Sequence, residues 1–267
     1  MRTAPAEIRD LVQHLHAEGR LRVWSVIVTI MGEIAQPNGG EISMAALLEI
    51  CTALDIEPQA VRTAMSRLSK DGLVVGKRVG RTAYYQFSVQ GLVEYQVAES
   101  VIYAAPQKID DWTFAFAADG VSVNAVQQQF EANPPLVLGG RCYVWPTDVW
   151  AQISHSKASD LMIFDARPRD MPIWARGTIL PVLNSETCRM ISAGCRTLTG
   201  FELKPNQAVF VRVLLIHFWR RLVLRYAYIE APIADWPFSQ AHRDIAAIYP
   251  KLLNVSGTKQ AALARFK

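Results

Sequence analysis

The sequence predicts an α+β protein with more than one domain, and three observations support this fold class. The chain has 267 residues, which is long for one domain, and 51% of them are hydrophobic, which suffices for a sizeable core. Residues 42–88 follow the order helix, turn, helix and two strands. Residues 112–164 alternate strand patterns with a helical pattern, as a helix-backed sheet does.

The N-terminal part predicts a buried helix that precedes the helix–turn–helix order. Residues 20–35 are apolar on nearly every side, which is typical of a helix inside a core. Pro37, Asn38, Gly39 and Gly40 then predict a turn.

Local signals set the bounds of two further helices. Ser43 is a typical N-cap for a helix that runs to about Leu54. Pro58 suits the first turn of the next helix, and Gly72 suits its C-terminal cap. Strand patterns follow at 73–75 and 82–88, joined by the basic turn 76–81. This order predicts a winged helix-turn-helix domain.

The second of these helices separates an apolar face from a polar one. Val61, Ala64, Met65 and Leu68 form the apolar face. Arginine, glutamine, serine and threonine are among the residues that read base edges in the major groove, and lysine and arginine bind phosphates. The predicted base-reading residues are Gln59, Arg62, Thr63 and Ser66. The other predicted DNA-binding residues, mainly phosphate anchors, are Arg67, Lys70, Lys77, Arg78 and Arg81.

The distribution of charge favours double-stranded DNA as the partner. Residues 57–81 contain six basic and two acidic residues, so their net charge of +4 equals that of the whole chain. Such local concentration is the expected footprint of a nucleic-acid site. The alternative is a solvated helix face with ordinary charges, but the hairpin with further basic residues argues against it.

The rest of the chain predicts two more domains. A helix at 91–105 either links domains or pairs with its copy in a dimer. Strands at 112–117, 136–138, 142–145 and 161–164, with a helix at 122–132, are compatible with a ferredoxin-like arrangement. Helical patterns follow at 186–199, 205–226 and 238–253. The predicted domains are therefore 1–89, 90–185 and 186–267.

No motif in the sequence indicates an enzyme, a metal site or a cofactor. The four cysteines are scattered, and GxGxxG, GxSxG and HExxH motifs are absent. Asp110 and Asp111 precede a strand and would suit a metal-dependent nuclease, but paired acids at a strand start are more often a solvated turn. The N-terminus lacks a signal-peptide pattern, and charged residues interrupt the apolar run 208–228, so we expect a cytoplasmic protein without membrane spans.

A cluster of cations lies on the apolar helix near residue 220. His217, Arg221 and Arg225 are spaced by four, so they share one helix face, and Arg220 lies next to it. Several cations on an apolar helix could bind a phosphate-bearing or carboxylate ligand. The alternative is that these side chains pair with Glu202, Glu230 or Asp235.

Two regions of the chain carry ordered motifs that match one known protein family. The first includes Trp24-Ser25, Gly39-Gly40-Glu41, Val61-Arg62-Thr63-Ala64, Arg67-Leu68, Gly72, Val79-Gly80-Arg81 and Tyr84-Tyr85. The second includes His217-Phe218-Trp219-Arg220-Arg221, Leu224-Arg225, Ala234-Asp235-Trp236-Pro237 and Ala241. With these motifs the chain resembles the PaaX family of bacterial repressors of phenylacetate degradation. Because the ordered matches bracket the chain, the resemblance extends to the whole protein.

The resemblance implies a winged-helix domain, a Cas2-like ferredoxin-fold central domain and a helical C-terminal domain. It also implies a homodimer on a palindromic operator, released by an acyl-CoA effector such as phenylacetyl-CoA. Tyr226-Ala227 stand where the family has Asp-Pro, and Phe238 stands where it has Gly. These departures leave the identity of the inducer open, including another acyl-CoA or an aromatic acid.

The resemblance and the cation cluster together predict an effector site near residue 220. Its predicted residues are His217, Trp219, Arg220, Arg221, Arg225 and Trp236. A ligand-responsive repressor is the leading hypothesis. A Cas2-like metal-dependent nuclease and a ligand-independent architectural protein are the alternatives.

Overall fold

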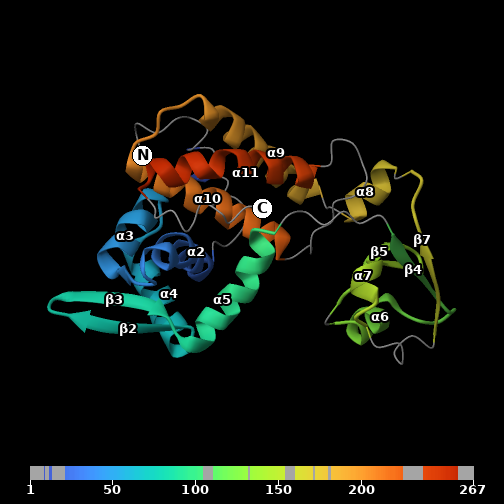
Figure 1. Cartoon of the computed structure of the whole chain (residues 1–267). Helices are drawn as coiled ribbons and strands as arrows, with labels where there is room; N and C mark the ends of the chain where they lie inside the picture. The colour runs from blue at the N-terminus through green and yellow to red at the C-terminus, as the bar shows by residue number, and fades with distance from the viewer. Residues whose placement is uncertain are drawn as a thin grey trace. The chain divides into compact units, whose positions relative to one another are not determined.

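The computed structural model confirms a mixed fold of helices and antiparallel sheets (Figure 1). It describes residues 9, 12, 13, 22–104, 111–131, 133–153, 160–170, 172–179, 182–224 and 237–257. Two compact units divide the chain. Unit 1 comprises Met1–Ala105, Thr187–Ala227 and Gln240–Lys267, and unit 2 comprises Pro106–Glu186 and Tyr228–Ser239. Unit 1 thus joins segments that the sequence analysis assigned to different domains.

The first helix of unit 1 whose bounds are described changes its winding after two turns. The α-helix α2 (Val23–Ile30) continues as a π-helical turn, η1 (Met31–Ala35), and then as a 3₁₀ turn, η2 (Gln36–Asn38). The expected helix over residues 20–35 is therefore α-helical only to Ile30. π-Helical turns are rare, and they often occur at functional sites.

Two helices and a small sheet follow η2. They are β1 (Ile42–Ser43), α3 (Met44–Ala53), α4 (Pro58–Lys70), β2 (Val74–Val79) and β3 (Thr82–Phe87). The Ser43 side chain accepts a hydrogen bond from the Ala46 amide at 3.1 Å, which confirms the predicted N-cap. Gly72 has φ of 74°, which lets the chain turn sharply out of α4 into β2.

The sheet of unit 1 is antiparallel, with strand order β1-β3-β2. The hairpin pairs Val74 with Phe87 at its base and Val79 with Thr82 at its tip. Helix α5 (Val89–Ile102) leaves the base of this hairpin, and the Ser88 side chain caps it by accepting from the Gly91 amide at 2.9 Å. The hairpin therefore connects directly to α5.

Three C-terminal helices complete unit 1. They are α9 (Val182–Thr199), α10 (Pro205–Val223) and α11 (Pro237–Val255), the first and last of which begin in unit 2. Nearly every side chain in the middle of α10 is buried, and α10 contacts α2, α3, η1 and α5. Helix α10 is thus the central element of the core of this unit.

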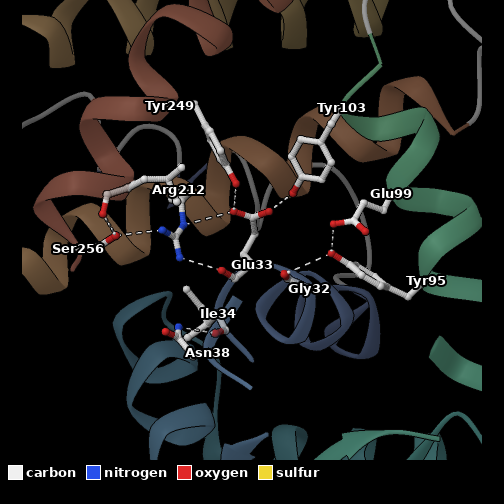
Figure 2. Close-up of polar contacts among 11 residues, drawn as sticks. Gly32, Glu33, Ile34, Asn38, Tyr95, Glu99, Tyr103, Arg212, Tyr249 and Ser256 are labelled. Atoms are coloured by element: carbon white, nitrogen blue, oxygen red, sulfur yellow. Dashed lines mark hydrogen bonds and ion pairs between the residues drawn. The ribbon is translucent and has the colours of Figure 1, made fainter. Parts of the chain in front are cut away.

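A buried polar network fastens η1 to α5, α10 and α11 (Figure 2). Arg212 Nε lies 3.2 Å from Glu33 Oε2, and the two side chains are 0% and 1% exposed. Tyr103 donates a hydrogen bond to the other carboxylate oxygen, and Tyr249 donates to Oε2 at 2.9 Å. Arg212 also donates to the Glu33 carbonyl at 2.8 Å and to Ser256 Oγ at 2.9 Å.

Unit 2 is built on a four-stranded antiparallel sheet with strand order β5-β6-β4-β7. Its elements in chain order are β4 (Trp112–Ala117), α6 (Val123–Gln129), β5 (Leu136–Gly139), β6 (Cys142–Pro146), α7 (Thr147–Trp150), β7 (Leu161–Ala166) and α8 (Ile173–Ile179). One sheet face packs on a core that includes Phe130, Trp145 and Trp150. The strands expected from the sequence in this region are confirmed. Among the described residues, no helix combines the length and hydropathy that crossing a membrane requires.

Candidate functional site

The first candidate surface is formed by α4 and the β2–β3 hairpin. The predicted apolar face of α4 is confirmed, because Val61, Ala64, Met65 and Leu68 are buried. All nine predicted DNA-binding side chains are exposed, which leaves them accessible to a partner: Gln59, Arg62, Thr63, Ser66, Arg67, Lys70, Lys77, Arg78 and Arg81.

The cations of this surface differ in their acidic neighbours. Arg67 Nε lies 3.5 Å from Asp71 Oδ2, and Lys77 pairs with Glu41. Within the described residues, no acidic side chain pairs with the remaining four cations, Arg62, Lys70, Arg78 and Arg81. These four can bind an external anion without first breaking an ion pair.

The Thr63 side chain already forms a hydrogen bond with the backbone of its own helix. Its hydroxyl donates a hydrogen bond to the Gln59 carbonyl at 2.9 Å. The hydroxyl oxygen can still accept a hydrogen bond, as from an amino group at a base edge.

The second candidate site is a cavity of about 230 Å³ within unit 1. It lies among α2, η1, α5, α10 and the base of the hairpin. Its walls are mostly apolar and aromatic, with Trp24, Phe87, Tyr95 and Tyr103 among the lining residues. One predicted effector residue, Arg220, lines it as well.

Arg220 is held by the polar groups of α2. Its Nη1 donates to the Ser25 carbonyl at 2.9 Å and to Thr29 Oγ1 at 3.0 Å. Burial lowers the pKa of the guanidinium to about 10, while nearby Tyr95 acts in the opposite direction. Because this pKa is well above 7, Arg220 is a cation at neutral pH. Its described partners lie on α2, and Glu202, one of the three acids considered as partners of the cations, is not among them; the other two, Glu230 and Asp235, lie outside the described residues.

His217 supports Thr29 rather than lining the cavity. Its Nδ1 lies 3.2 Å from Thr29 Oγ1, and the Thr29 hydroxyl donates to the Ser25 carbonyl at 3.0 Å. Burial and the charges of Arg220 and Arg221 lower the pKa of His217 to about 3. The imidazole is therefore neutral, and its Nδ1–H donates to the threonine oxygen.

The other predicted effector residues do not gather at this cavity. Arg221 is exposed, and Trp219 is fully buried, where its Nε1 donates to the Ile102 carbonyl at 2.8 Å. Arg225 and Trp236 lie outside the described residues. The structure thus brings His217 and Arg220 together on Thr29, and of the four described effector residues only Arg220 lines the cavity.

Sequence reasoning missed the contribution of α2 and α5 to this site. Ser25 and Thr29 are polar residues four positions apart on an otherwise apolar helix. That spacing places both on one face, and it is the signal that could have indicated a buried polar partner.

The acidic pair considered for a nuclease is only half described. Asp110 lies outside the described residues, and Asp111 forms a two-point ion pair with Arg167, with distances of 3.1 and 3.3 Å. Both side chains are exposed. In the part of the chain that the structure describes, no three metal-ligating side chains come together.

Comparison with known proteins bears on both candidate sites. Residues 22–91, which include α4 and the hairpin, match the family model of PaaX-like proteins. The resemblance to the PaaX family is confirmed. The transcriptional repressor PaaX of Escherichia coli (strain K12) is 26% identical over 282 residues, with 92% of this chain and 85% of PaaX covered.

A solved structure shares the fold at low sequence identity. The uncharacterized protein Rv0674 from Mycobacterium tuberculosis superimposes with a TM-score of 0.50 and 12% identity. The match covers 87% of this chain and 96% of Rv0674. At this identity the match indicates the fold alone.

Proposed function

We propose that this PaaX-like protein is a transcriptional repressor that binds double-stranded DNA through α4 and the β2–β3 hairpin. The observation that carries the proposal is the exposed cationic surface inside the segment that matches the family. Four of its cations have no acidic partner among the described residues. The order of α3, turn, α4 and hairpin supports a winged helix-turn-helix.

The proposed roles follow from the chemistry of each side chain. Arg62 can donate two hydrogen bonds to guanine, and Gln59 can pair with adenine. Thr63 and Ser66 can serve either base. Arg67, Lys70, Lys77, Arg78 and Arg81 bind phosphates, which positions the protein without reading sequence.

We further propose a cytoplasmic homodimer on a palindromic operator of an aromatic-acid or acyl-CoA catabolic operon. An acyl-CoA such as phenylacetyl-CoA would release it, because a ligand that prefers the DNA-free conformation lowers operator affinity. A hundredfold loss of affinity requires about 2.7 kcal/mol of coupling. The effector residues proposed from the sequence are His217, Trp219, Arg220, Arg221, Arg225 and Trp236.

For unit 2 we infer a ferredoxin-like fold, as in Cas2-like domains. The β-α-β-β-α-β order of β4, α6, β5, β6, α7 and β7 supports this inference. The three-domain division, with boundaries after residues 89 and 185, stays a prediction.

Fluorescence anisotropy with operator and random duplexes tests the DNA proposal. The operator would first be selected from random-sequence DNA by the wild-type protein. Arg62→Ala should weaken operator binding more than random-duplex binding, because it removes a base contact. Arg78→Ala should weaken both equally and lower the salt slope by about one.

Arg243→Ala is the matched control, because Arg243 is exposed on α11, which is not part of the candidate surface. It should leave both affinities unchanged. Equal losses on operator and random DNA for Arg62→Ala would refute its base-reading role. An operator affinity that no CoA ester changes would indicate an architectural protein instead of a ligand-controlled repressor.

A further inference from the structure

The cavity of unit 1 has the size of a single-ring molecule. An apolar protein cavity of about 150 Å³ takes benzene. The cavity here measures about 230 Å³, so a ring with a short substituent fits, whereas a whole CoA ester does not. Its aromatic walls, from Trp24, Phe87 and Tyr95, suit the faces and edges of such a ring.

Arg220 gives this apolar cavity one anion-binding group. Only Nη1 of its guanidinium has acceptors among the described residues, namely the Ser25 carbonyl and Thr29 Oγ1. Nε and Nη2 therefore remain available as a fork. Such a fork matches the two oxygens of a carboxylate.

The two acidic residues at the cavity do not cancel this charge. The Glu33 carboxylate is already bound by Arg212, Tyr103 and Tyr249. Glu94 is exposed, and its Oε1 accepts from Gln90 Nε2 at 2.9 Å. Among the described lining residues, Arg220 is thus the cation that a ligand in the cavity contacts.

We propose that this cavity binds a compact aromatic monocarboxylate, with its ring between α2 and α5 and its carboxylate on Arg220. The ligand class is a free acid of about one ring, and on this proposal Arg220 binds that acid and not the acyl-CoA effector proposed above. A CoA ester has no free carboxylate at its acyl end, so it cannot make this ion pair.

The position of the cavity gives such binding a route to the DNA-binding surface. Leu73 and Phe87, at the base of the hairpin, line the cavity together with Ile216 and Arg220 of α10. An occupant therefore contacts both the hairpin and the helix that organises the core. This regulatory consequence rests on the proposed repressor function, whereas the binding site itself does not.

Isothermal titration calorimetry on the DNA-free protein tests the site. The probes are benzoate, phenylacetate and 3-phenylpropanoate, with phenylacetamide as the uncharged analogue of phenylacetate. We expect binding of at least one acid and much weaker binding of the amide. Arg220→Gln should weaken acid binding by about 10- to 100-fold, because the hydrogen bonds between the guanidinium and the carboxylate are lost.

A second variant tests the cavity without touching the cation. Ala98 lines the cavity from α5, so Ala98→Leu should fill part of it and abolish acid binding. Val97→Leu places the same leucine side chain at the neighbouring position, which is 65% exposed and outside the lining, and this variant should bind like wild type. Arg243→Gln controls for loss of one exposed positive charge, and melting curves confirm that each variant folds.

The outcomes separate this inference from the repressor proposal. Acid binding that is lost in Arg220→Gln and Ala98→Leu supports the site, even where no operator is found. No binding of any acid, or binding that both variants leave unchanged, overturns the site while DNA binding stands. Equal affinity for phenylacetate and phenylacetamide also overturns it, because the carboxylate would then play no part.

Discussion

Replacing Glu33 by glutamine should destabilise unit 1 strongly, because it leaves Arg212 as an uncompensated buried cation. The substitution keeps the size of the side chain, and its amide oxygen can still accept from one tyrosine. Arg212 is 0% exposed, so water cannot replace the lost carboxylate. Breaking a buried pair in this way costs about 3–5 kcal/mol. At about 2–4 °C per kcal/mol, the melting temperature should fall by about 6–20 °C.

Thermal unfolding followed by circular dichroism measures this effect, and Asp71→Asn provides the comparison. Asp71 belongs to the same unit, but its pair with Arg67 is largely solvated, with side chains 49% and 71% exposed. Solvated pairs contribute little to stability, so this variant should melt close to wild type. A melting temperature for Glu33→Gln within the same narrow range would refute the reasoning. Adding Arg212→Met to Glu33→Gln should restore part of the loss, since the unpaired charge is then removed.

Two further predictions concern the pH dependence of stability and the contact between α5 and the base of the hairpin. The pKa of His217 is about 3 in the folded protein against 6.5 when unfolded, so the folded state binds fewer protons and stability falls as the pH drops below 6.5. When the pH falls from 6.5 to 5, the unfolding free energy from urea titration should decrease by up to about 2 kcal/mol less in His217→Asn than in wild type. An equal decrease in both proteins would contradict this. Gly91→Ala should lower the unfolding free energy by about 1–3 kcal/mol, because its Cβ would lie 2.0 Å from the Leu73 carbonyl oxygen. Gln90→Ala, exposed and one position earlier, should unfold like wild type in the same urea titration.

Local signals explain why the cationic surface could be predicted from the sequence. Ser43, Pro58 and Gly72 each act within about one helical turn, and the structure places α3, α4 and the hairpin where they indicate. The faces of α4 followed in the same way, because helical spacing alone separates Val61 and Leu68 from the polar side chains.

Long-range pairing explains what the sequence did not reveal. The π-helical turn at η1 directs Glu33 to Arg212, which lies 179 positions further along the chain. No pattern within a helix shows such a partner. The cavity was missed for a similar reason, because α2, α5 and α10 each supply only a few of its walls.

Helix α8 was not predicted, and its burial pattern shows why. Ile173 and Trp174 are 86% and 62% exposed, although both are large and hydrophobic. Apolar periodicity indicates a helix only where the apolar side chains face a core. In α8 the exposed side chains obscure that period.

The distance in sequence between Glu33 and Arg212 also sets the order of events during synthesis. A ribosome adds about 5–20 residues per second, so Arg212 is added roughly 9–36 s after Glu33. Once residue 87 has been added, the nascent chain carries α4 and the hairpin on a unit that still lacks α10. A product truncated before Arg212 should therefore be a protease substrate rather than a lasting competitor for DNA. Unit 1 therefore acquires its final stability when the chain is complete, and not when α4 is synthesised.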